Sequence, residues 1–126
     1  LERRGYMIKD FRDLIVWKKS HQLFLDIVKD VELFPKTQAA RIIIDQILRA
    51  CGSISANIAE GFGRRKGKEY LHYLIISRGS TTETLNWLIK CLDIGWMNKD
   101  IFKKREDTIV EIMKMLNKMI GQKIND

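Results

Sequence analysis

Hydrophobic residues recur three and four positions apart along most of the chain, which is the spacing of helices with one buried face. The clearest example is a stripe on one segment that falls within an arc of about 100° when each residue turns the helix by about 100°: Ile43, Ile44, Ile47, Cys51, Ile54 and Ile58. No segment alternates in the manner of a β-strand. The pattern predicts four helices, over about residues 13–33, 38–60, 68–93 and 99–119.

Residues with strong backbone preferences predict where these helices begin and end. Asp13 is a suitable N-cap for the first helix, and Pro35 ends it by moving Phe34 out of helical geometry. Gly61 and Gly95 are expected to end the second and third helices. Because the connections are short, each helix runs antiparallel to the one before it. The fold class predicted is all-α, an up-down-up-down antiparallel four-helix bundle.

The same spacing predicts which residues of the other helices face the core. They are Trp17, Phe24, Ile27, Val28 and Val31 in the first helix; Leu71, Leu74, Ile75, Thr82, Leu85, Ile89 and Leu92 in the third; and Phe102, Ile109, Ile112, Met113, Leu116 and Ile120 in the fourth. Arg78 lies in the middle of the third stripe, where an unpaired buried charge costs several kcal/mol, on the order of 3 to 5. We therefore expect a structural arginine that is hydrogen-bonded within the chain.

A second row of the residue 38–60 helix is unusual because it carries mostly short polar side chains instead of Lys and Glu: Gln46, Arg49, Ser53, Asn57 and Glu60. Folding this helix back on the next one sets Gly52 level with Arg78, and Ser53 close in height to Ser80. By the same count, Arg49 comes within about a turn of Glu83 and is a candidate ion pair. Two readings stay open here: a close helix crossing inside the bundle, or a flat surface that another subunit covers.

A chain of 126 residues with 45% hydrophobic residues is large enough for one packed domain, expected over residues 11–126. Residues 1–10 are expected to form a poorly ordered N-terminal extension. No apolar run approaches the roughly 18 residues of a membrane span, so no membrane partner is expected. Cys51 and Cys91 sit on predicted helices and are expected to be reduced, buried thiols of a cytoplasmic protein.

The balance of 23 Lys and Arg against 16 Asp and Glu gives a net charge of +7, which favours an acidic partner such as nucleic acid. Four cations lie within five residues of the turn after the second helix: Arg64, Arg65, Lys66 and Lys68. Lys18 and Lys19 are expected at the same end of the bundle, and Lys99, Lys103, Lys104 and Arg105 at the opposite end. Charge at both ends suits non-specific phosphate contacts. The alternative is an ordinary solvated turn whose cations are favoured by the helix dipole.

The glycine-rich turn does not match a phosphate-binding loop. Five residues separate Gly61 from Gly67, where a Walker loop has four, and Glu69 replaces the residue that would hold magnesium. His21 and His72 lack metal-ligand spacing, and no serine lies in a nucleophile motif. We therefore expect no enzymatic activity, no metal and no cofactor.

Several segments resemble a known family: DLIVW at 13–17, FP at 34–35, RA at 49–50, ANIAEGF at 56–62, and RGS at 78–80 followed by Glu83. They are similar to the four-helix bundle proteins encoded in intervening sequences of bacterial 23S ribosomal RNA genes, which are related to the accessory variability protein of diversity-generating retroelements. The resemblance implies a homo-oligomeric ring, a homopentamer, with a basic surface. Asn57, Glu60, Arg78 and Ser80 match polar positions of the family. Nothing in this chain identifies a reverse transcriptase as its partner.

The sequence therefore predicts a non-enzymatic, basic homo-oligomer that binds RNA or DNA with little sequence specificity through Arg64, Arg65, Lys66 and Lys68. Self-association is expected through small and polar residues of the second and third helices: Arg49, Gly52, Ser53, Asn57, Glu60, Arg78, Ser80 and Glu83. The alternative is a structural or adaptor oligomer that recruits a protein partner and binds no nucleic acid.

Overall fold

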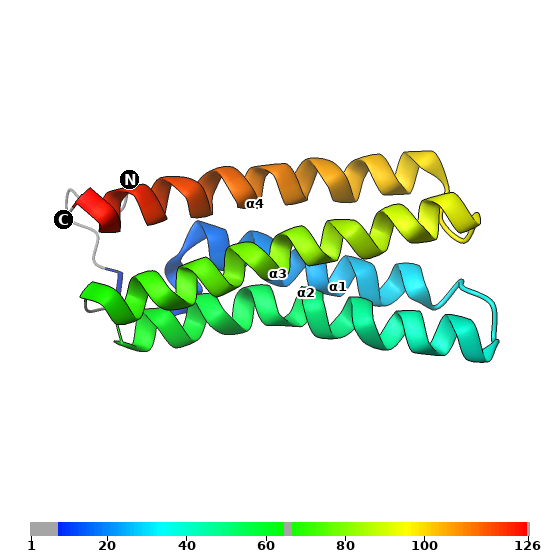
Figure 1. Ribbon diagram of the computed structural model, residues 1–126, viewed down its shortest axis with the longest axis horizontal. Coiled ribbons are helices and arrows are strands. Elements are labelled where there is room, and N and C mark those ends of the chain that lie inside the picture. Colours follow the sequence, from blue (N-terminus) through cyan, green and yellow to red (C-terminus); the bar gives the residue numbers. More distant parts are fainter. Residues whose placement is uncertain (1–7, 65–66, 126) are drawn as a thin grey trace.

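The computed structural model describes residues 8–64 and 67–125, and four long helices make up most of them (Figure 1). A short 3-10 helix, η1 (Phe11–Asp13), precedes α1 (Ile15–Val31), α2 (Gln38–Arg64), α3 (Gly67–Ile94) and α4 (Lys99–Asn125). No strand occurs in these described ranges. The prediction of an all-α fold with four helices is confirmed.

The four helices lie side by side with their axes along the long dimension of the molecule (Figure 1). The start of α1, the passage from α2 into α3 and the end of α4 lie at one end, which we call the turn end. The α1–α2 and α3–α4 connections lie at the other end, the far end. α2 packs between α1 and α3, and α4 packs between α3 and α1. This is the up-down-up-down order that the short connections predict.

Asp13 does not cap the first long helix as predicted, and Asp10 is the N-cap of the short helix η1 that precedes it. The Asp10 carboxylate accepts a hydrogen bond from the Arg12 backbone N–H at 2.7 Å. Asp13 completes the capping box by accepting from the Asp10 backbone N–H at 3.1 Å. α1 itself follows Leu14, which makes no side-chain cap. Hydrogen bonds from the Arg12 side chain and backbone lower the pKa of Asp10 to about 2.

The prediction that Gly61 ends the second helix is wrong, because α2 continues to Arg64 and buries Gly61 within it. A Cβ atom at position 61 would lie 2.9 Å from the Tyr73 Cβ and 3.1 Å from the Tyr70 Cδ1. Glycine is therefore required here by the close approach of α3. Gly95 does follow the end of α3 as predicted, with φ of 96°, a conformation that favours glycine.

The core contains the predicted stripes of α2 and α4. Ile47, Cys51, Ile54 and Ile58 of α2 are fully buried, and the buried residues of α4 are Ile109, Ile112, Leu116 and Ile120. Phe102 and Met113 are half-buried. Both free thiols lie inside, as predicted.

The predicted stripes of α1 and α3 are wrong in part, because the buried arc is displaced around each helix. The buried residues are Val16, Ser20, Leu23, Ile27 and Val31 in α1, and Tyr70, Leu74, Ser77, Thr81, Thr84, Leu88 and Cys91 in α3. Ile75 and Ile89 are instead 41% exposed. In α3, hydropathy predicts the wrong buried arc because the helix turns hydroxyl side chains toward the core.

These inward hydroxyl groups are hydrogen-bonded to main-chain carbonyls. The Ser77 Oγ donates to the Ile54 carbonyl of α2 at 2.8 Å, and Thr81 Oγ1 donates to the Ser77 carbonyl at 2.8 Å. Thr84 Oγ1 donates to the Ser80 carbonyl at 2.8 Å. Satisfied hydroxyls of small volume can be buried without the penalty of an unpaired polar group, and they let α2 and α3 pack closely.

By length and composition alone, α2 could cross a membrane, so the expectation that no segment approaches such a span is wrong by this measure. The evidence is weak, because the core helix of a bundle passes the same test. Ile47, Ile54 and Ile58 fill the core, and Arg41 and Asp45 lie on the exposed side.

We expect Gly61→Ala to lower the free energy of unfolding by about 1–2 kcal/mol, because the new methyl group forces α2 and α3 apart. Gly63→Ala is the matched control, since no atom lies within 4 Å of a Cβ at that position. It should be neutral or raise stability by up to about 1 kcal/mol, through helix propensity. Thermal unfolding followed by circular dichroism compares the two. Equal melting temperatures would show that the close approach at Gly61 carries no strain.

Burial raises the pKa of the Cys51 thiol to about 12 and that of Cys91 to about 11. Both thiols therefore stay protonated at mildly alkaline pH, and we expect no reaction with a water-soluble disulfide reagent in the native protein. Both should react at once after unfolding in guanidinium chloride. Rapid labelling of the native protein would contradict the packed core around α2 and α3.

Candidate nucleic-acid interface

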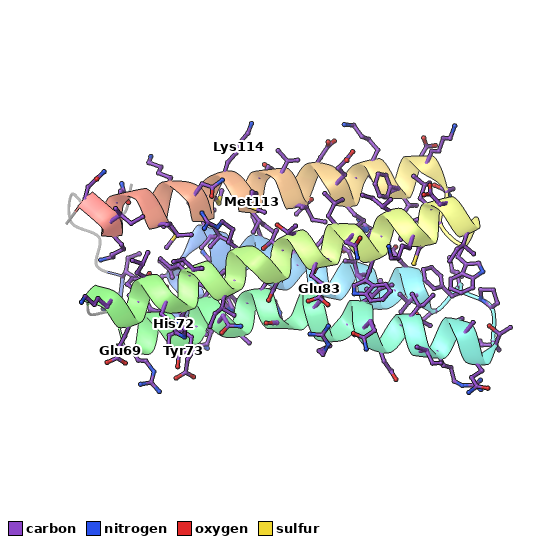
Figure 2. All side chains as sticks on the ribbon, in the orientation of Figure 1. Glu69, His72, Tyr73, Glu83, Met113 and Lys114 are labelled. Carbon is purple, nitrogen blue, oxygen red and sulfur yellow. The ribbon has the colours of Figure 1, made fainter. Side chains whose placement is uncertain are left out.

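The polar row of α2 lies along its outer seam with α3. Arg49 forms an ion pair with Glu83 of α3, as predicted, and its guanidinium also donates to the Gln46 Oε1 at 2.9 Å. The Trp87 Nε1 donates to the Glu83 Oε2 at 3.2 Å. Figure 2 shows Glu83 at the middle of this seam. These groups are therefore engaged with one another within the chain.

The small residues of α2 make two different contacts. The Ser53 and Ser80 hydroxyls are 2.8 Å apart across the α2–α3 seam, and the Asn57 Nδ2 donates to the Ser53 carbonyl at 2.8 Å. Gly52 does not lie against this seam. A Cβ there would be 3.4 Å from the Phe24 ring of α1. At these positions the close crossing inside the bundle is what the structure shows.

Arg78 is half-buried, and its Nη1 donates to the Asn117 Oδ1 of α4 at 3.1 Å. This bond confirms the expectation that the arginine is hydrogen-bonded within the chain. It draws the charge toward α4 and away from the outward side of α3.

In the basic turn, Arg64 is not the free cation that the sequence suggests, because it is paired with carboxylates. The Arg64 Nε donates to the Glu60 Oε2 at 2.9 Å, and its Nη1 donates to the Glu69 Oε2 at 3.1 Å. Its guanidinium carbon lies 5.5 Å from the centre of the Tyr73 ring, and Figure 2 shows Glu69 and Tyr73 together at this end. The hydrogen bonds that Arg64 donates to the two carboxylates raise its pKa. Two carboxylates thus more than offset the charge of this one guanidinium.

Of the other three predicted cations of the turn, only Lys68 lies within the described residues. Arg65 and Lys66 lie outside the described residues. Lys68 is exposed in the first turn of α3. It lines a shallow depression together with Gly67, Leu71 and Lys123 of α4.

Sequence reasoning missed the lysines of the second half of α4. Residues 112–125 contain three lysines and no carboxylate, whereas residues 99–111 contain four cations and four carboxylates. Because α4 runs from the far end to the turn end, Lys114, Lys118 and Lys123 add positive charge toward the turn end. Figure 2 shows Lys114 pointing away from the bundle. The absence of Asp and Glu from residues 112–125 was the signal available in the sequence.

At the far end, by contrast, cations are matched by carboxylates. The Arg105 Nε and Nη2 donate to the Asp30 carboxylate at 2.6 and 2.9 Å, and Asp26 lies 3.6 Å away. Lys103 pairs with Asp107 at 3.0 Å. Cations do lie at both ends, as expected, but the far-end half of α4 carries as many carboxylates as cations.

At the start of α1 the two neighbouring lysines differ. Lys18 is exposed, whereas Lys19 pairs with Glu111 of α4 at 3.4 Å. Only Lys18 of this pair adds an exposed cation near the turn end. Within residues 8–64 and 67–125, no three His, Cys, Asp or Glu side chains gather where they could hold a metal ion.

Comparison with known proteins agrees with this fold. The model of the 23S rRNA-intervening sequence protein family matches residues 12–118, which is most of the chain. The chain belongs to this family. A similar solved structure is that of a protein of unknown function from the S23 ribosomal protein family of Bacteroides thetaiotaomicron, with a TM-score of 0.78 and 25% identity. The likeness covers 84% of this chain and 98% of that one. No curated protein gives a significant match.

We expect the Arg105 cluster to stabilise the family fold at the far end and to play no part in binding. The Arg105 and Asp30 side chains are only 15% and 12% exposed, so Arg105→Ala leaves a largely buried carboxylate unpaired. Stability should fall by about 2–4 kcal/mol. Lys103→Ala, whose side chain is 67% exposed, should cost less than about 1 kcal/mol. Chemical denaturation measures both, and equal losses would contradict this difference.

Proposed function

We propose that this chain works as a basic homo-oligomer that binds RNA or DNA through phosphate groups at its turn end, with little sequence specificity. The observation that carries the proposal is the uneven distribution of charge along α4. Its half near the turn end has three lysines and no carboxylate, while its other half is balanced.

Three of the described carboxylates near the turn end are paired with arginines: Glu60 and Glu69 bind Arg64, and Asp10 binds Arg12 at 2.8 Å. The lysines nearby are exposed to solvent: Lys18, Lys68, Lys114 and Lys118. This end of the molecule therefore presents a positive potential that attracts a polyanion.

The geometry supports contacts with phosphates more than with bases. Lysine ammonium groups on helix surfaces act as mobile point charges, and such contacts position a nucleic acid without reading its sequence. The family name ties these proteins to an intervening sequence in 23S rRNA, which supports an RNA-related role and makes structured 23S rRNA the first ligand to test.

The homopentameric ring implied by the family resemblance is part of this proposal. A ring would bring several lysine-rich ends onto one assembly. Joined weak sites bind a long polyanion more tightly than a single site does, because later contacts are intramolecular. A weak attraction at the turn end of each subunit would then give the whole assembly a much higher affinity for the nucleic acid.

The test compares two double charge reversals on the same helix. Lys114→Glu with Lys118→Glu changes the turn-end half of α4, and Lys99→Glu with Lys104→Glu makes the same change in total charge at the far end. All four lysines are exposed, so both variants should fold. Fluorescence anisotropy with a labelled fragment of structured 23S rRNA should show a loss of affinity of at least about tenfold for the first variant and a much smaller loss for the second.

Salt dependence completes the experiment. Native affinity should fall steeply as salt rises, and the turn-end variant should show a slope shallower by about 2, because each removed lysine neutralises roughly one phosphate. Equal losses of affinity in both variants would overturn the placement at the turn end. An oligomer with no salt-dependent affinity for RNA or DNA would favour the adaptor function, in which the assembly recruits a protein.

A further inference from the structure

Three aromatic rings follow one another at the start of α1, near the turn end. The Trp17 and His21 rings are stacked, with their centres 4.7 Å apart and their planes 10° from parallel. The Phe11 ring of η1 meets the Trp17 ring edge-on, at 5.1 Å and 67°. Phe11 and Trp17 are half-buried, whereas His21 is exposed. These three residues, which we call the aromatic row, therefore end in an exposed imidazole whose plane is set by the indole beneath it.

This arrangement distinguishes His21 from other aromatic side chains of the described residues. His72 is also exposed, but it meets the Tyr73 ring edge-on, at 5.3 Å and 72°. The Tyr73 ring lies under the Arg64 guanidinium, and the Trp87 indole N–H donates to a carboxylate. His21 instead has one face on a parallel ring and the rest of its imidazole in solvent.

The side of α2 that lies next to the aromatic row has only small side chains. Gly52 faces α1, since a Cβ atom there would lie 3.4 Å from the Phe24 ring. Ala56, Ala59 and Gly63 follow at intervals of four, three and four residues, so they share this side and continue it toward the turn end. Ala56 and Gly63 are exposed, and no atom lies within 4 Å of a Cβ at position 63. This side of α2 therefore leaves room for a planar ligand beside the imidazole.

The charges around the aromatic row favour an anionic ligand. Residues 14–25 contain two lysines and no carboxylate. Lys18 is exposed and lies three residues before His21, so the two side chains are neighbours on the helix surface. The carboxylates that precede this stretch, Asp10 and Asp13, accept hydrogen bonds in the capping box of η1. A phosphate next to the imidazole would therefore meet an ammonium group.

We propose that the aromatic row binds an unpaired base of a nucleic acid, which stacks on the imidazole of His21 while Lys18 contacts the neighbouring phosphate. An aromatic face beside a cation is how many proteins hold single-stranded nucleic acids. This inference rests on the proposed function and narrows its ligand to unpaired nucleotides. It is compatible with little sequence specificity, because every base has a face that can stack.

The contact predicts a preference among nucleic acids. In a regular duplex the bases are paired and stacked on one another, so none is available to the imidazole. Phosphate contacts through lysines such as Lys114 and Lys118 are open to paired and unpaired strands alike. The protein should therefore favour loops and single strands over an uninterrupted duplex.

Three single substitutions in the full chain test the contact. His21→Ala removes the stacking surface, and His21→Phe keeps a flat ring but removes both nitrogens. His72→Ala is the matched control, because it makes the same change at the other exposed histidine, which Figure 2 shows at the same end of the molecule. Both side chains are exposed, so all three variants should fold, and helical circular dichroism checks this.

Fluorescence anisotropy at moderate salt compares a labelled oligothymidylate with a strand of equal length that lacks the bases, so that the number of phosphates is the same. On the oligothymidylate, His21→Ala should lose affinity by about fivefold or more, whereas His21→Phe and His72→Ala should stay within about twofold of the native chain. On the strand without bases, all four proteins should bind alike.

The other outcomes separate this inference from the proposed function. Native-like binding of the oligothymidylate by His21→Ala would overturn the base site and leave phosphate binding intact. An equal loss in His72→Ala or in His21→Phe would overturn it as well, and so would an equal loss on the strand without bases. A native chain with no salt-dependent affinity for either strand would overturn the proposed function itself.

Discussion

The close packing of α2 on α3 is the contact on which the other features depend. Gly61 removes the side chain that would collide with Tyr73, and Ser77 bonds to the carbonyl of Ile54 across the interface. A large aliphatic side chain at either position would hold the helices farther apart. Because both helices are 27 or 28 residues long, this packing fixes their relative rotation along much of the molecule.

That rotation decides where charges meet. It brings Arg49 to Glu83, and the turn into α3 brings Glu69 to Arg64, which already pairs with Glu60 four residues earlier on α2. Side chains that look like free cations in the sequence are thereby neutralised. The lysines of the second half of α4, by contrast, have no carboxylate on their own segment.

The same rotation gives α3 its two apolar sides. Small hydroxylated residues face α2 and the core, which leaves Ile75 and Ile89 outside.

The sequence by itself determined the four helices, their order, the stripes of α2 and α4, the buried thiols, and the Arg49–Glu83 pair, because these follow from helical periodicity and short connections. Only the tertiary structure decided that Gly61 serves a close crossing, that α3 turns Ser77, Thr81 and Thr84 inward, and that Arg64 and Arg105 are paired. Except for Arg64, whose partners Glu60 and Glu69 are four and five residues away, each of these depends on a neighbour distant in sequence or on the rotation of one helix against another. Hydropathy along a single helix carries no information about that rotation when, as in α3, apolar residues lie on two of its sides.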